Sequence, residues 1–267
     1  MMFLASILVV AAVAACLIWP FYVESRKEYR KLVDAPRLTV RALSYLRELP
    51  EWAVLEARTG AGTATAPLSA TRCAWYRVTA GRTHLVGDAA SEVMSAVIYS
   101  ETSQDNGIPL VDVVDSDAVV WLSGDLAARS LGSTFPTLTT STVDERAGFP
   151  EPAGGGWPYL RQLQADGHLS TGDLLPAKHA HGLAVAEQIA PADTPVLILG
   201  RPQRRDNGIV LLSAGGWKNR LEGVTTWPDS RVRRQFAVRV TVYRRLIAGC
   251  LIVIVLACGA IAILGAG

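Results

Sequence analysis

The side chains best suited to binding a metal or moving a proton are concentrated in one stretch of this 267-residue chain. His168, His179 and His181 lie there, with Asp166 and Asp173 close by. If the segment were extended, His179 and His181 would project to one side, as two zinc ligands or a catalytic pair do. The stretch is rich in Gly and Pro, however, and histidines in such loops more often face solvent. We therefore expect no metal or cofactor here, and keep the three histidines as the alternative, a hydrolase site or metal site.

Other catalytic patterns are missing from the sequence or fit it poorly. No Gly-x-Ser-x-Gly motif occurs, and Gly154–Gly156 does not follow a strand as a phosphate-binding loop would. Asp112, Asp115 and Asp117 alternate with apolar residues, which favours an exposed strand face and turn over calcium ligation. Cys73 is the one cysteine outside the apolar ends, so we expect neither an intramolecular disulfide nor a Cys-based zinc site. We predict a protein without autonomous catalysis.

The two ends of the chain are apolar and uncharged. Residues 1–23 and 246–267 contain no Asp, Glu, Lys or Arg, and each is long enough for the about 20 helical residues that cross a bilayer. We predict one transmembrane helix at each end. Cleavage as a signal peptide, or lipidation at Cys16, is the alternative for the first span, but the start lacks basic residues and the apolar run continues past any cleavage site.

Basic side chains flank only the inner ends of these two spans. The positive-inside rule then places both termini outside and the central region on the cytoplasmic side of a cell membrane. The net charge of +2 is small, and no basic patch interleaved with aromatic residues predicts nucleic-acid binding. Arg far exceeds Lys and Ala is abundant, as in proteins of GC-rich bacterial genomes. The cations expected at the membrane surface, read chiefly as topology determinants, are Arg26, Lys27, Arg30, Lys31, Arg231, Arg233, Arg234, Arg244 and Arg245.

Short strand-like runs separated by turn residues fill the central region. The turns at Asn106-Gly107 and Asn207-Gly208 suit the positive backbone angles of tight turns. This pattern predicts a mainly β (α+β) domain, an antiparallel sandwich or barrel. The predicted strands are Ala53–Arg58, Cys73–Thr79, Ser95–Tyr99, Leu110–Val114, Ala118–Leu122, Val196–Gly200 and Ile209–Leu212.

The remaining segments complete the predicted organisation. Residues 24–50 form a helical stalk broken near Pro36, and residues 51–245 form the β-rich domain. Within it, residues 139–181 form an irregular insertion with one short helix at Trp157–Gln164. On the strand at Cys73, Cys73 and Trp75 share one face and Tyr76 lies on the other. Small residues of the second span, Gly249, Gly259 and Ala262, would allow close helix packing within or between chains.

Three short motifs punctuate the central region. The first is Pro67-Leu68-Ser69 followed by Cys73-x-Trp75-Tyr76, the second is Ile108–Asp112, and the third is Glu187-x-Ile189-x-Pro191 before Val196–Gly200. Together they resemble the GIDE-type, or beside-a-membrane (BAM), domain of mitochondrial membrane-anchored E3 ubiquitin ligases and their bacterial relatives. The residues that carry the resemblance are Pro67, Leu68, Ser69, Cys73, Trp75, Tyr76, Asp112, Glu187 and Gly200.

The resemblance covers about residues 54–245 and includes the layout of a domain between two spans. In the ligases, a C-terminal RING that binds two zinc ions recruits the conjugating enzyme, and this sequence has no such Cys and His set after the second span. The resemblance therefore implies a membrane-anchored interaction, scaffold or regulatory protein, with an E3 ligase-like transferase as the alternative. The partners expected are the lipid bilayer, a protein, and a second copy through the spans.

Overall fold

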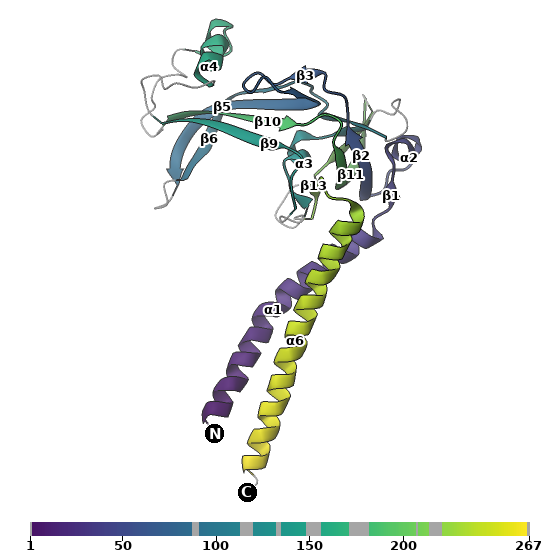
Figure 1. The fold of residues 1–267 in the computed structure, drawn as a ribbon, viewed down its shortest axis with the longest axis vertical. Coiled ribbons are helices and arrows are strands. Elements are labelled where there is room, and N and C mark those ends of the chain that lie inside the picture. Colours follow the sequence, from purple (N-terminus) through teal and green to yellow (C-terminus); the bar gives the residue numbers. More distant parts are fainter. Residues whose placement is uncertain are drawn as a thin grey trace. The chain divides into compact units, whose positions relative to one another are not determined.

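The structure, a computed structural model, divides into two compact units. It describes residues 2–86, 91–112, 120–131, 135–147, 156–170, 182–206, 208–213 and 221–265. One unit, the helix pair, comprises Met1–Ala35 and Trp227–Gly267, and the other, the β domain, comprises Pro36–Thr226. Both are drawn in Figure 1.

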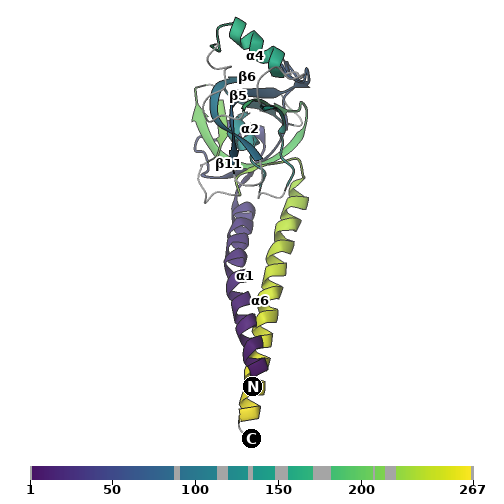
Figure 2. The same cartoon turned by 90° about the vertical axis from the view of Figure 1, so that its left-hand side faces the viewer.

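The helix pair consists of α1 (Met2–Asp34) and α6 (Asp229–Gly265). The two helices run side by side in both views (Figures 1 and 2) and contact each other. Each is long and apolar enough to cross a bilayer, and 6% of the residues in its most apolar window are buried. Each helix also continues beyond its apolar part into a charged segment, residues 24–34 of α1 and residues 229–245 of α6. The segment 229–245 extends for about 25 Å at the helical rise per residue.

A closed five-stranded barrel forms the centre of the β domain. The strands follow the order β2-β7-β8-β12-β11, and pairing of β2 with β11 closes the ring. Neighbours are antiparallel except for β8 and β12, which are parallel. This strand order is that of the Greek-key OB barrel. The strands are β2 (Ala53–Thr59), β7 (Ile108–Val111), β8 (Val120–Leu122), β11 (Pro195–Arg205) and β12 (Gly208–Leu212).

Apolar residues of alternating strand positions fill the barrel. Leu55, Ile198 and Leu211 are among its fully buried side chains. Two short strands extend the sheet: β1 (Arg37–Leu38) pairs with β2, and β13 (Gly223–Thr225) pairs with β11. The predicted barrel is therefore confirmed, although the two pairs β8–β12 and β1–β2 are parallel.

Residues 36–50 belong to the β domain and differ from the predicted stalk. After α1 ends, β1 is followed by α2 (Val40–Tyr45), whose first turn is capped by the Thr39 hydroxyl accepting a hydrogen bond from the Ala42 N–H at 3.1 Å. Val40 and Leu43 are buried in the barrel core. Leu38, Leu46 and Leu49 lie outside this helix and pack against the same core, and α1 ends just before Pro36 as predicted.

A second, four-stranded antiparallel sheet has the order β6-β5-β10-β9. Two insertions into the barrel build it: β5 and β6 lie between β2 and β7, while β9 and β10 lie between β8 and β11. The small ribbon of β3 (Ala64–Thr65) and β4 (Arg72–Cys73) precedes β5, and α3 (Gly124–Ala127) follows β8. The second insertion also contains α4 (Gly156–Ala165). The strands are β5 (Trp75–Val86), β6 (Ser91–Thr102), β9 (Thr140–Ala147) and β10 (Gly182–Ala190).

The structure corrects the predicted insertion and confirms parts of it. The segment 140–147 is strand β9 and not irregular, because backbone pairing with β10 orders a sequence without apolar alternation. Helix α4 confirms the short helix. The hairpin between β11 and β12 is also confirmed, with Gly208 at φ +122°. Gly107 has φ +101°, but its turn joins β6 and β7, which belong to different sheets.

Candidate functional site

A buried carboxylate binds the backbone of the first of the three motifs, the one that begins at Pro67. Glu187 on β10 is fully buried, and its two carboxylate oxygens accept hydrogen bonds from the backbone N–H groups of Leu68 at 2.7 Å and Ser69 at 3.1 Å. We call these three residues the Glu187 clamp. Hydrogen bonds to a charged acceptor are among the stronger ones in proteins. The clamp fixes the loop between β3 and β4, which contains Pro67, on β10, the last strand of the second insertion.

Cys73 lies in a small apolar cluster beside this clamp. It is fully buried with Ala66 and Ile189, and its Sγ lies 3.8 Å from the carbonyl oxygen of Ala64. Burial, and after it the negative charge of Glu187, raises the pKa of the Cys73 thiol. A raised pKa leaves too little thiolate for a nucleophile. The prediction that Cys73 is a core residue is confirmed.

The structure does not place Cys73 and Trp75 on one face. The strand is interrupted at Ala74, whose N–H donates to the carbonyl oxygen of Ala190 at 3.0 Å. As a result Trp75 enters the barrel core, whereas Tyr76 packs against the cluster of Cys73. The alternation expected of one continuous strand was wrong because two strands, β4 and β5, share this segment.

Trp75 joins the second sheet to the barrel. It is 1% exposed, and a β-carbon on Gly124 of α3 would lie only 2.8 Å from its ring. The guanidinium of Arg77 lies 5.4 Å from the centre of the Trp75 ring and forms an ion pair with Asp125 at 2.9 Å. The absence of a side chain at Gly124 is therefore what lets α3 approach the ring.

The last two motif residues also have structural partners. At Gly200, a β-carbon would meet Cδ2 of Leu126 at 2.7 Å, so a larger residue at this strand position would displace the Leu126 side chain. Asp112 accepts a hydrogen bond from the Arg41 N–H at 3.3 Å. Asp115 and Asp117 lie outside the described residues, so the calcium alternative rests on the sequence alone.

A second carboxylate, that of Glu101, accepts hydrogen bonds from three tyrosine hydroxyls. The Tyr76 hydroxyl donates to Glu101 Oε1 at 3.1 Å, and the Tyr99 and Tyr159 hydroxyls donate to Oε2 at 2.8 Å and 2.9 Å. These residues come from β5, β6 and α4. We call the four of them the Glu101 cluster.

The hydrogen bonds change the acidity of every member. Burial alone raises the pKa of Glu101, but the hydrogen bonds from Tyr99, Tyr159 and Tyr76 together lower it below its ordinary value. Burial, and next the hydrogen bond to Glu101, raises the pKa of Tyr76 to about 12. The same two causes raise the pKa of Tyr99 and of Tyr159. The stable form of the cluster is thus one carboxylate surrounded by neutral phenols.

Of the three histidines singled out from the sequence, the structure describes His168 alone. Its ring lies against Tyr99, with centroids 5.6 Å apart, and its positive charge contributes to lowering the pKa of Glu101. His179 and His181 lie outside the described residues, as does Asp173. Among the residues that the structure describes, no group of three His, Cys, Asp or Glu side chains is arranged to hold a metal ion.

The Glu101 cluster attaches α4 to the sheet. Tyr159, Leu160 and Leu163 of α4 are buried against a patch that includes Val78 and Val185 of the sheet. A general acid or base needs a pKa near the working pH and a reachable proton. Glu101 has a lowered pKa, and its two oxygens already accept three hydrogen bonds, which suits positioning better than proton transfer. Sequence reasoning missed Glu101, although the spacing Tyr99-x-Glu101 places both side chains on one strand face.

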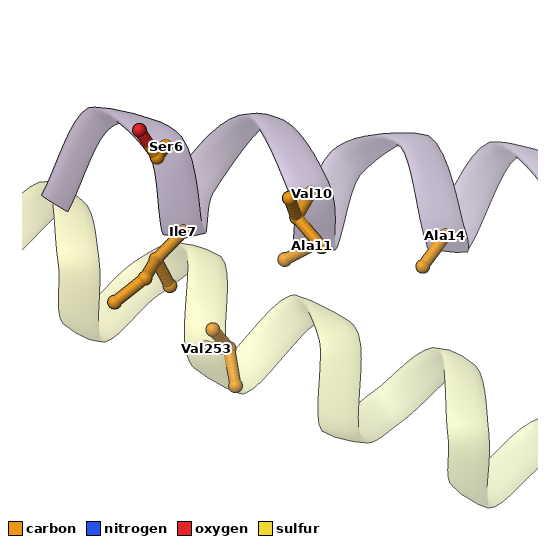
Figure 3. A pocket seen from close by; sticks show the side chains of 6 residues that line it. All are labelled: Ser6, Ile7, Val10, Ala11, Ala14 and Val253. Atoms are coloured by element: carbon orange, nitrogen blue, oxygen red, sulfur yellow. The ribbon is translucent and has the colours of Figure 1, made fainter. Parts of the chain in front are cut away.

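The helix pair supplies the remaining candidate features. Phe21 of α1 stacks on Tyr243 of α6 with ring centroids 6.4 Å apart. Gly249 and Gly259 have open space where a β-carbon would lie, so they do not form the close contact with α1 that their size allows. Nearer the two chain ends, an entirely apolar groove of about 300 Å³ opens between the helices (Figure 3). Its lining residues are Ser6, Ile7, Val10, Ala11, Ala14 and Val253.

No protein-family model, curated protein or solved structure matches the chain. The resemblance to GIDE/BAM domains therefore rests on the motif residues and on the placement of a β domain between two apolar helices. The structure gives several of those motif residues partners within the β domain.

Proposed function

We propose that this chain is a membrane-anchored interaction module, in which a GIDE/BAM-like β domain is held at a membrane surface by α1 and α6. The observation that carries the proposal is the exposure of the apolar helix surfaces. Val10 is 68% exposed, Leu17 64% and Val255 69%, although each lies in a segment long enough to span a bilayer. Such an extended apolar surface is costly in water and favourable in lipid.

The charge distribution supports an orientation for this anchor. Segments 24–34 and 229–245 contain ten of the 26 Lys and Arg side chains but four of the 24 Asp and Glu side chains. The apolar parts of α1 and α6 separate these segments from the chain ends. By the positive-inside rule, the β domain then faces the cytoplasm and both termini face outward.

For the second sheet, an interaction role is better supported than catalysis by its polar sites. The Glu101 cluster and the Glu187 clamp use their carboxylates to hold loops and α4 in place. Strand β6, by contrast, is twelve residues long and pairs with β5 alone among the described strands. An open strand edge is a place where an extended segment of another protein adds by backbone hydrogen bonding.

The interaction proposal is tested by site-specific photocrosslinking of the full chain in cells. A photoreactive amino acid replaces Val97, which is 60% exposed on β6, and the matched control places it at the exposed Gln203 of β11. We expect a discrete protein adduct from position 97 and none from position 203. Absence of an adduct at position 97, or equal adducts at both positions, would remove β6 as the interaction edge.

A further inference from the structure

Aromatic side chains mark one level along the helix pair. The Phe21–Tyr243 stack joins α1 to α6, and Trp19 lies against Tyr22 with ring centroids 5.8 Å apart. Aromatic residues of this kind concentrate where a membrane meets water. From Phe21 back to the start of the chain, and from Leu246 to its end, no residue is charged, so the hydrocarbon side is defined on both helices.

Four cations lie close to this aromatic level. Arg26 and Lys27 follow it on α1, while Arg244 and Arg245 adjoin Tyr243 on α6, and all four are exposed. The ion pairs to Asp193, Asp125, Glu51 and Asp229 are made by arginines outside this set. We call these four residues the cation collar. Glu24 and Glu28 are the acidic residues near this level on α1, and α6 has none after Asp229.

The collar contrasts in charge with the β domain. Residues 36–226 contain 16 Lys and Arg but 20 Asp and Glu, so the surplus of positive charge in the chain lies entirely in the helices. An anionic membrane surface therefore repels the β domain as a whole and attracts the collar. The near-neutral total charge of +2 conceals this division.

We infer that the cation collar binds the phosphate-bearing headgroups of anionic lipids. The inference rests on the proposed membrane anchoring and adds to it a preferred lipid class. Guanidinium groups bind phosphate oxygens in pairs of hydrogen bonds, and a cation near an anionic membrane surface strengthens binding by about fivefold. At the collar, Arg244 and Arg245 supply two guanidinium groups that are adjacent in the sequence, and Arg26 and Lys27 supply two further charges on α1.

Electron paramagnetic resonance of spin-labelled lipids tests this inference on the full chain. The chain is reconstituted in phosphatidylcholine vesicles with a trace of spin-labelled phosphatidylglycerol or spin-labelled phosphatidylcholine. The motionally restricted fraction of each label gives their relative association with the protein. We expect the anionic label to associate several-fold more strongly, and R244Q/R245Q to bring the ratio close to one.

The matched control is R231Q/R234Q, which removes the same charge from the same helix about 15 to 20 Å further from the collar. It should keep the preference, because that distance exceeds the screening length of about 8 Å at physiological salt. A wild-type ratio near one, or an equal loss in the control variant, would overturn the inference. Absence of a restricted component for both labels would instead overturn the membrane anchoring itself.

Free phosphate is separated from lipid headgroups by exchanging the buffer salt. When chloride is replaced by inorganic phosphate at equal ionic strength, we expect the lipid preference to persist. Loss of the preference in phosphate alone would show that the collar binds free phosphate, and would contradict the assignment to lipid.

Discussion

At the residue scale, the carboxylates of the buried Glu187 and the partly buried Glu101 act on different partners. Glu187 accepts hydrogen bonds from backbone N–H groups, and Glu101 accepts them from three tyrosine hydroxyls. A buried carboxylate without donors is costly, so each residue depends on the segments that supply its partners. The two carboxylates thereby connect segments that are far apart in the sequence.

The Glu101 cluster predicts an unusual alkaline titration. The chain has seven tyrosines, and the phenols of Tyr76, Tyr99 and Tyr159 should ionise above the ordinary value of about 10, because each phenolate would form beside Glu101. Phenolate absorbance of the folded full chain against pH measures this. We expect a delayed phase, with the pKa of Tyr76 at about 12, that disappears in denaturant.

The same shifts set the direction of stability. The pKa values of these phenols are raised by folding, so their contribution is complete below about pH 10 and is lost as pH rises through the folded values. Y76F should remove one phenol from the delayed phase, while Y45F, at a 77% exposed tyrosine outside the cluster, should leave the delayed phase unchanged. A single phase near the ordinary value for all seven phenols would contradict the cluster.

Glu101 shows what residue patterns could and could not predict. Its position two residues after Tyr99 indicates a shared strand face, but Tyr159 belongs to a helix more than fifty residues later. The histidines are candidates because their side chains can bind a metal or move a proton. The structure places His168 against Tyr99, where it acts on the pKa of Glu101. This site depends on tertiary contacts between segments that are far apart in the sequence, and no local pattern encodes such contacts.

At the element scale, the Glu187 clamp joins β10 to the loop between β3 and β4. E187Q should destabilise the chain by about 1.5 to 3 kcal/mol, because the amide offers one neutral acceptor to two N–H donors and turns its own donors toward them. Denaturant unfolding of the full chain in micelles measures the change.

The matched control for the clamp is E56Q, the same substitution at an exposed residue of β2. It should change the free energy of unfolding by less than about 0.5 kcal/mol. Equal effects of the two substitutions would show that the clamp contributes no more than a surface carboxylate.

Elements with long apolar runs could be predicted from the sequence, whereas a strand ordered by backbone pairing with its neighbour could not. Strands β2, β11 and β12 carry continuous apolar residues and form the barrel where expected. Strand β9 is polar and lies at a sheet edge, so its order comes from β10. The leucines before Pro50 predict one helix, but only Leu43 lies on α2. Leu38, Leu46 and Leu49 pack against the barrel core from outside this helix, an arrangement that tertiary contacts determine.

At the scale of the whole molecule, the two apolar ends of the sequence predict the layout of a domain between two helices. Absence of charge over two long segments predicts two apolar helices from composition alone. The start of the second helix was harder to predict, because residues 229–245 are rich in arginine and were assigned to the domain. The structure makes them part of α6, with Val232 and Phe236 buried four residues apart on one helix face.

Cysteine accessibility in intact cells tests the anchored layout most directly. The four native cysteines are replaced, and one cysteine is introduced either as D206C at the exposed turn between β11 and β12 or as F3C near the start of α1. With a membrane-impermeant thiol reagent, we expect F3C to react in intact cells and D206C to react only after permeabilisation. Labelling of D206C in intact cells would contradict a cytoplasmic β domain held between two membrane-spanning helices.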